Sequence, residues 1–259
     1  MRALGSLSVL LSLLVSSVSA NAQAVRIAAA ADLQFAMNEL TGRYEKTTGR
    51  KVSVTYGSSG NFRTQIKNGA PFDLFFSADV QYPELLISSG LADADTLYVY
   101  AYGRLVLWSP AAANLQLAKR GFGALQDPRV TKIAIANPEH APYGRAAVAA
   151  LQKAGVYNDV KAKLVYGENI SQAAQFVQSG SAQVGMLALS LTYADSMKGG
   201  ERWDVPSDLY PALEQAAVVV HASANKRAAQ AFLDYVKGPE GRQILEQYGF
   251  TLGRAAAKP

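Results

Sequence analysis

Short apolar runs and helically spaced apolar residues alternate along most of this chain. Residues 25–30 form a nearly continuous apolar run, and apolar positions then recur at helical spacing across residues 33–44. This pattern predicts a buried strand followed by a helix that starts at Asp32 and ends near Gly49. The same succession recurs twice, with strands at 51–56 and 73–77 and helices at 62–69 and 83–89. Strict alternation of strands and helices is typical of a parallel sheet covered on both faces.

A second series of the same kind follows a predicted strand at 103–108. It has strands at 132–136, 161–166 and 183–189, helices at 145–154 and 170–178, a further strand at 215–221, and two helices within 225–248. We therefore predict an α/β protein with two lobes, each a mainly parallel sheet flanked by helices, joined by two crossover strands. Lobe 1 is expected to hold residues 25–103 and 221–259, and lobe 2 residues 104–220. Hinge rotation is expected near Gly103 and His221.

The first 24 residues have the composition of a signal peptide. A short positive start is followed by an apolar stretch from Leu4 to Val18, too brief to span a bilayer, and then by small residues with Ala-x-Ala spacing. We expect cleavage near Gln23 or Val25 and an exported mature chain. The chain has no Cys, which excludes a lipid-anchored Cys, disulfides and thiolate metal sites.

The charge pattern argues against a nucleic-acid partner. The formal net charge is +5, and the 25 Lys and Arg residues are scattered along the chain rather than clustered. Scattered positive charge gives a general attraction for anions and aids solubility, whereas nucleic-acid binding calls for a basic stripe.

Four predicted strand-to-helix junctions share small residues and contain no Lys or Arg. They are residues 28–32, 57–60, 77–79 and 142–144. Small side chains let a ligand approach the backbone, and the free N–H groups at helix N-termini carry a partial positive charge. Ser and Tyr hydroxyls add neutral donors. Such junctions suit a small dianion held by hydrogen bonds without a counter-charge.

Five segments carry a family resemblance. They are residues 28–33, 57–60, 69–79, 137–142, and 237–240 together with 248–250. In this order and spacing they resemble the periplasmic molybdate-binding proteins of bacterial ABC importers, which are type II periplasmic binding proteins. The resemblance implies a periplasmic, hinged protein that closes on a tetrahedral oxyanion, molybdate and also tungstate. It also implies that the protein delivers its ligand to a membrane permease and acts as a monomer. It further implies that the protein needs no cofactor and catalyses no reaction.

The resemblance also implies a set of ligand residues. Ser59 is similar to the hydroxyl ligand of the family with Ser58 beside it, and Ala78, Ile170 and Tyr143 match backbone donors. The chain departs from the pattern at Ala31-Asp32, where many members have Ser, and at Ala188, where some place a ligand Tyr. The Tyr143 phenol is expected to compensate. The predicted set is Ala31, Asp32, Ser58, Ser59, Ala78, Tyr143 and Ile170.

Asp32 needs a separate interpretation. A carboxylate beside a dianion repels it unless the anion carries a proton, as phosphate does at neutral pH and molybdate does not. The interpretation we favour is a helix N-cap, with the side chain turned to its own backbone N–H groups. Phosphate stays open as an alternative ligand because of Asp32. Sulfate stays open as well, because discrimination between sulfate and molybdate depends on the size of the cleft.

Two other classes of function are less well supported. A hydrolase needs a base near a nucleophile, and the chain offers only His140 and His221 and lacks a Gly-x-Ser-x-Gly elbow. A hard-cation site would require Asp32, Asp73 and Asp79 to converge. We therefore expect neither an enzyme nor a cation site.

Overall fold

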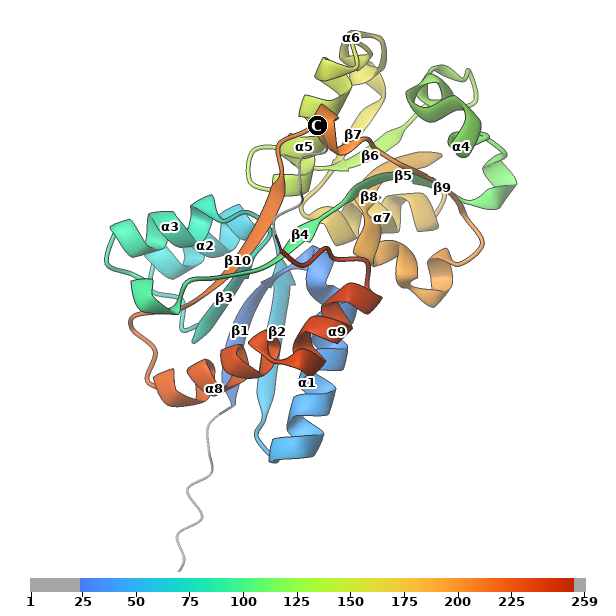
Figure 1. The fold of residues 1–259 in the computed structure, drawn as a ribbon. Helices are drawn as coiled ribbons and strands as arrows, with labels where there is room; N and C mark the ends of the chain where they lie inside the picture. Colours follow the sequence, from blue (N-terminus) through green and yellow to red (C-terminus); the bar gives the residue numbers. More distant parts are fainter. Residues whose placement is uncertain (1–23, 254–259) are drawn as a thin grey trace, which may run out of the picture.

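The computed structural model describes residues 24–253, which form two lobes (Figure 1). Each lobe contains one five-stranded sheet, with strand order β2-β1-β3-β10-β4 in lobe 1 and β7-β6-β8-β5-β9 in lobe 2. The strands are β1 (Val25–Ala30), β2 (Val52–Gly57), β3 (Leu74–Ser77), β4 (Tyr98–Gly103), β5 (Leu105–Ser109), β6 (Ile133–Ala136), β7 (Leu164–Gly167), β8 (Val184–Ala188), β9 (Glu201–Asp204) and β10 (Leu213–Val219).

Helices cover both faces of each sheet. They are α1 (Gln34–Thr48), α2 (Ser59–Lys67), α3 (Gln81–Ser88), α4 (Leu117–Arg120), α5 (Pro142–Lys153), α6 (Tyr157–Val160), α7 (Ile170–Gln178), α8 (Lys226–Lys237) and α9 (Pro239–Gln247). Eight short 3-10 segments lie between them within the described residues, of which η1 (Ala31–Leu33), η6 (Leu189–Tyr193) and η8 (Ser207–Leu209) bear on the site.

The central strand β1 shows how the sequence places two cores around one sheet. Successive side chains of a strand point to opposite faces. Ile27 and Ala29 accordingly join the core under α1, α8 and α9, whereas Ala28 joins the core under α2 and α3. β1 is therefore buried on both sides, which explains why its sequence is almost continuously apolar. α1 ends at Gly49, whose φ of 70° is the left-handed conformation that favours glycine at a helix end.

Both sheets are mixed rather than wholly parallel. β1, β2 and β3 pair in parallel, as do β6, β7 and β8. β10 runs antiparallel to β3 and β4, and β5 runs antiparallel to β8 and β9. The predicted two-lobed α/β fold with parallel central strands is confirmed, and antiparallel strands complete each sheet.

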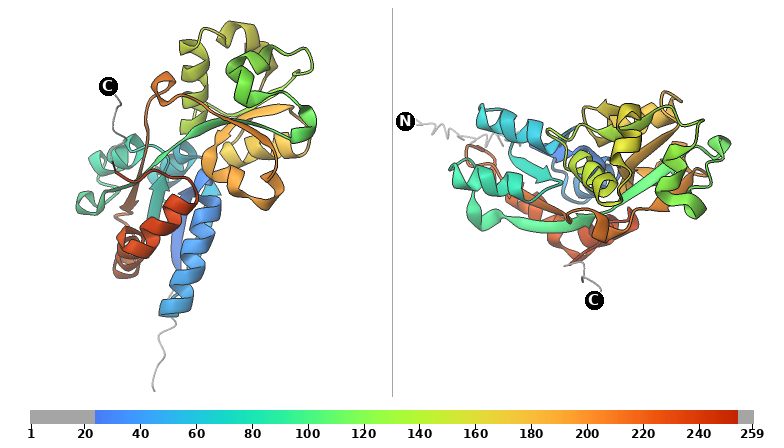
Figure 2. Two further views of the ribbon diagram at one scale, coloured as in Figure 1. Left: turned by 45° about the vertical axis from the view of Figure 1, so that its right-hand side comes forward. Right: turned by 90° about the horizontal axis from the view of Figure 1, so that it is seen from above.

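The chain crosses between the lobes twice. The first crossover is Arg104, between β4 in one sheet and β5 in the other, and Figure 2 shows this green run passing from lobe to lobe. The second lies between β9 and β10, across residues 205–212. Leu213 pairs with Gly103, so the two crossovers lie side by side.

The predicted end of lobe 2 at residue 220 is wrong. β10 belongs to the lobe 1 sheet, because it inserts between β3 and β4. His221 follows the far end of that strand, so the second crossover is near Leu213 rather than His221. The apolar sequence of residues 213–220 fits a buried strand in either lobe, and only pairing with distant strands decides between them.

Other predictions differ in detail. β7 starts at Leu164, because residues 161–163 form a 3-10 turn, and sequence patterning did not indicate β4 or β9. The predicted signal peptide, except for Ala24, lies outside the described residues. Within residues 24–253, no helix has the length and apolar character needed to span a bilayer.

Candidate ligand-binding site

A cavity of about 200 Å³ lies between the lobes, where the carboxyl ends of the central strands meet. All seven residues predicted from the sequence line it, together with Ala30, Gly57, Ala141 and Pro142. Their convergence follows from topology, because parallel strands of one sheet end at the same edge. The structure therefore brings the whole predicted set to one place.

The lobe 1 wall consists of the junctions that follow β1, β2 and β3. Ser58 ends the loop after β2, and Ser59 is the first residue of α2. The Ser59 hydroxyl oxygen accepts the N–H of Ala78 at 3.0 Å, so its own hydrogen is available for another acceptor. The buried Ser58 hydroxyl has no hydrogen-bond partner among the described residues. Two hydroxyls therefore line this wall with donor capacity to spare.

The lobe 2 wall consists of the N-termini of α5 and α7. Pro142 opens α5 and brings no N–H group, which leaves the Tyr143 N–H in the first turn. At α7 the Asn169 side chain accepts from the N–H groups of Ser171 and Gln172. The N–H of Ile170 does not donate to this capping side chain. Both helix ends carry the partial positive charge that favours anions.

The cavity lining contains no Lys, Arg or His side chain, and Asp32 is its only carboxyl. Positive potential there comes from helix N-termini and hydroxyl hydrogens rather than from cations. A cavity of this chemistry can hold a small anion by directed hydrogen bonds.

Asp32 lies inside η1 and is not an N-cap residue, so the predicted cap is wrong, although its carboxyl does lie by the backbone N–H groups of Asp32 and Leu33. No side-chain cap hydrogen bond starts either η1 or α1. Instead, Asp32 Oδ2 accepts the amide Nε2 of Gln215 at 2.6 Å, and Oδ1 has no partner among the described residues. Burial raises the pKa of Asp32 to about 6, and hydrogen bonds from Gln215, Tyr143 and the backbone N–H groups of Asp32 and Leu33 oppose that rise. The strongest hydrogen bond to the carboxyl comes from a residue 183 positions away rather than from the start of a helix.

The Tyr143 phenol belongs to the same buried cluster. Its oxygen lies 3.3 Å from Gln215 Nε2. A Cβ atom on Gly103 would stand 2.2 Å from that oxygen, so glycine makes room for the phenol at the first crossover. The phenol thus contacts Gln215 and the crossover strand. Ala188 is buried at the end of β8 and is not part of the cavity lining.

Direct hydrogen bonds close the cleft around the cavity. The N–H of Gly60 in lobe 1 donates to the carbonyl of His140 in lobe 2 at 2.9 Å. The hydroxyls of Ser171 and Ser190 in lobe 2 donate to the carbonyls that precede α1, Ala31 at 3.0 Å and Asp32 at 2.7 Å.

At the rim of the cleft, Arg145 of α5 reaches lobe 1. It forms an ion pair with Asp79, donates to the Tyr82 hydroxyl at 2.8 Å, and lies over the Tyr82 ring. These contacts join α5 to the segment before α3 and to α3 itself.

Sequence reasoning missed four of these residues: Gln215, Ser171, Ser190 and Arg145. Each acts on a partner more than 60 positions away, so no local motif marks it. The one available signal was Gln215 itself, a polar residue within an otherwise apolar predicted strand.

The residues considered for catalysis or cation binding have other partners. His140 Nε2 lies 3.0 Å from the Glu168 carbonyl, and His221 Nδ1 lies 2.5 Å from Asp93. Among the described residues, neither histidine forms a hydrogen bond with the hydroxyl of Ser58 or Ser59.

The three aspartates do not converge. Asp73 accepts from the Arg26 N–H and the Ser223 hydroxyl, and Asp79 accepts the N–H of Gln81 besides pairing with Arg145. In the described part of the chain, no group of three His, Cys, Asp or Glu side chains is placed to hold a metal ion.

Comparison with known proteins agrees with this geometry. The family model described as bacterial extracellular solute-binding protein matches residues 25–251. The molybdate-binding protein ModA of Azotobacter vinelandii is 42% identical, with 90% of this chain and 92% of that protein covered. ModA of Rhodobacter capsulatus is 39% identical, with 91% of each covered.

A solved structure gives the same result for the fold. The Azotobacter vinelandii periplasmic molybdate-binding protein superposes with a TM-score of 0.83 at 33% identity, covering 89% of this chain and all of that one. The chain therefore belongs to the family of bacterial extracellular solute-binding proteins.

Proposed function

We propose that this chain binds a tetrahedral oxyanion, molybdate and also tungstate, in the cavity between its lobes and delivers it to the membrane permease of an ABC importer. One observation carries the proposal: hydroxyls and helix N-termini from both lobes line a single buried cavity that contains no cationic side chain. The names of the relatives at 42% and 39% identity support molybdate as the anion.

The predicted ligand residues divide into two kinds of donor. Ser58 and Ser59 would donate through hydroxyls, while Ala31, Tyr143 and Ile170 would donate through backbone N–H groups. The N–H of Ala78 donates to the Ser59 oxygen and so orients that hydroxyl. A hydrogen bond to a charged group contributes about 1.5–3 kcal/mol. Several together outweigh the lost translational freedom and give micromolar to nanomolar affinity. A tetrahedral anion offers acceptors in every direction, so both walls can bind it at once.

Binding is coupled to closure of the two lobes. Donors on one wall hold the anion first, and the other wall then rotates onto it about the adjacent crossovers at Arg104 and Leu213. The Gly60–His140 hydrogen bond and the Arg145–Asp79 ion pair form only when the walls meet, since they join opposite lobes. The closed form is then the one that the permease recognises.

The remaining expectations follow from the same proposal. The chain is exported to the periplasm through residues 1–24, acts as a monomer and releases its ligand unchanged. The lining lacks a histidine, and its serines have no base as partner, which supports binding without turnover.

Phosphate is the second candidate, and Asp32 is the observation that favours it. Asp32 lines the cavity, its Oδ1 has no hydrogen-bond partner among the described residues, and as a carboxylate it would accept a hydrogen bond from a protonated anion. Molybdate, tungstate and sulfate carry no such proton at neutral pH.

Calorimetric titration with molybdate, tungstate, sulfate and phosphate tests the proposal. We expect tight one-to-one binding of molybdate and tungstate and weaker or no binding of the other two. Tight binding of phosphate with no response to molybdate would establish the second candidate instead. No binding of any of the four anions would contradict both.

A further inference from the structure

Asp32 is a buried acid placed where a dianion is proposed to bind. Its exposed fraction is 1%, it lines the interlobe cavity, and one of its two carboxyl oxygens, Oδ1, has no hydrogen-bond partner within the described residues. Buried polar atoms are normally paired, so an unpaired one on a residue that lines a cavity indicates a missing partner. This inference rests on the proposed function, because that partner is taken to be the anion.

The groups that face Asp32 come from both lobes and are all neutral. Gln215 of β10, Tyr100 of β4 and Tyr143 of α5 surround the carboxyl, and the Ser190 hydroxyl of η6 donates to the Asp32 backbone carbonyl. Burial raises the pKa of both Tyr100 and Tyr143 well above the ordinary value, so they remain uncharged phenols. Tyr210, which follows η8, lies beyond Tyr143, and burial raises its pKa too. The residues that line the cavity include no lysine or arginine.

The hydrogen bonds also decide which carboxyl oxygen can hold a proton. The Tyr100 hydroxyl donates to Gln215 Oε1 at 2.8 Å, which turns the amide nitrogen of Gln215 toward Asp32. Oδ2 therefore accepts a hydrogen bond from Nε2. A proton on the carboxyl consequently belongs on Oδ1, the oxygen without a partner.

We propose that Asp32 binds the oxyanion as a neutral carboxylic acid, donating a hydrogen bond from Oδ1, so that one proton is taken up from solvent with each unprotonated dianion. A carboxylate and a dianion side by side in a buried cavity without a cation repel each other strongly, and a proton on Asp32 removes that repulsion. The anion keeps all its bonds: one dianion and one proton enter together. Asp32 thereby selects anions that lack a proton of their own.

The tendency of Asp32 to hold a proton exists before the anion binds. Burial places its pKa at about 6 in the closed cleft, and a nearby dianion moves it further upward. Above that pH the free protein must gain the proton on binding. The affinity for molybdate is therefore expected to fall about tenfold per pH unit there, and to level off at lower pH.

Calorimetry in buffers of different ionisation enthalpy measures the protons taken up. At about pH 8 we expect close to one proton per molybdate for the unaltered protein. Asp32→Asn supplies an N–H donor without a titrating proton, so we expect it to bind molybdate with no proton uptake and no pH dependence over the same range. Asp93→Asn, which changes an acid paired with His221 and Lys226 outside the cavity, should keep the uptake of the unaltered protein.

The outcomes separate this inference from the proposed function. Molybdate binding without proton uptake by the unaltered protein overturns the role of Asp32 and leaves the proposed function intact. If Asp32→Asn fails to fold, the proton uptake measured for the unaltered protein is sufficient to test the role of Asp32. Unchanged uptake in a folded Asp32→Asn protein also overturns it. Absence of molybdate binding by the unaltered protein contradicts the proposed function itself.

Discussion

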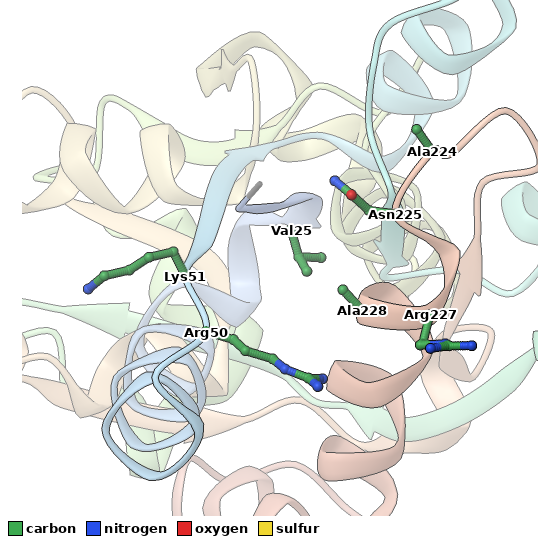
Figure 3. A pocket seen from close by; sticks show the side chains of 7 residues that line it. All are labelled: Val25, Arg50, Lys51, Ala224, Asn225, Arg227 and Ala228. Atoms are coloured by element: carbon green, nitrogen blue, oxygen red, sulfur yellow. The ribbon is translucent and has the colours of Figure 1, made fainter. Parts of the chain in front are cut away.

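The two edges of the lobe 1 sheet present two pockets of opposite character. At the carboxyl edge, the interlobe cavity has a volume of about 200 Å³ and is lined by small residues, hydroxyls and one acid. At the amino edge lies a wider pocket of about 660 Å³, lined by Val25, Arg50, Lys51, Ala224, Asn225, Arg227 and Ala228, which we name the basic pocket (Figure 3).

The basic pocket has three cations, yet its geometry is poorly suited to selective binding. Arg50, Lys51 and Arg227 are exposed, and Figure 3 shows Lys51 extending away from the other side chains. Exposed charges act through water and are screened by salt, whereas buried neutral donors keep their direction and strength. Positive charge alone therefore does not mark the anion site, whereas burial and convergence of donors do.

Blocking closure should have the largest effect on binding. A Cβ atom at Gly60 would lie 2.7 Å from the His140 carbonyl oxygen, a backbone atom of the opposite lobe. Gly60→Ala should hold the lobes apart and weaken molybdate binding about 100-fold, or about 3 kcal/mol, in a calorimetric titration. Gly42→Ala is the matched control, because its Cβ meets nothing within 4 Å. Equal affinities of the two variants would show that the closed cleft is not the bound form.

Removing the buried acid should stabilise the anion-free protein at high pH. The pKa of Asp32 rises from 3.8 to about 6 on folding. Its favourable contribution to the free energy of unfolding is therefore fully present below about pH 4 and is lost as pH rises through about 6. Asp32→Asn should therefore exceed the unaltered protein in free energy of unfolding by up to about 3 kcal/mol near pH 8, and by little near pH 4. Urea unfolding at both pH values measures this. A difference that stays constant with pH would argue against a buried, titrating Asp32.

Removing one donor from the cavity should have a smaller effect on affinity. Ser59→Ala deletes the hydroxyl at the start of α2, and we expect molybdate to bind more weakly by about 1–3 kcal/mol. Ser53→Ala, on the exposed side of β2, serves as the control and should leave the calorimetric affinity unchanged. Unchanged affinity of Ser59→Ala would remove this residue from the site.

Changing the basic pocket should have the smallest effect. Replacing both Arg50 and Arg227 by Ala removes two of its three cations, and at about 0.15 M salt we expect less than about a twofold change in molybdate affinity. Fluorescence or calorimetric titration suffices to measure it. A large loss of affinity would indicate that the anion binds in the basic pocket, at the amino edge of the sheet.

Much of the site could be predicted from sequence because it depends on local chemistry at strand ends. Small residues after β1 and β2 and the helix start at Ile170 are visible in the sequence, the family resemblance implies the ligand residues among them, and sheet topology then brings them together. The alternation of strands and helices likewise predicted the two-lobed fold.

The errors share one physical cause, which is pairing across long stretches of chain. Residues 213–219 were assigned to the wrong lobe because an apolar strand does not reveal its neighbours. Asp32 was interpreted as a cap because its true partner, Gln215, lies on that same strand. One misplaced strand therefore accounts for both the wrong lobe boundary and the wrong role of Asp32.

Anomalous diffraction from crystals grown with molybdate locates the bound anion directly, because the molybdenum signal does not depend on the protein's geometry. We predict one anomalous peak in the interlobe cavity, between the N-termini of α2 and α7, next to the Ser59 hydroxyl and the Ile170 N–H. A peak in the basic pocket beside Arg50 and Arg227, with none between the lobes, would contradict the account.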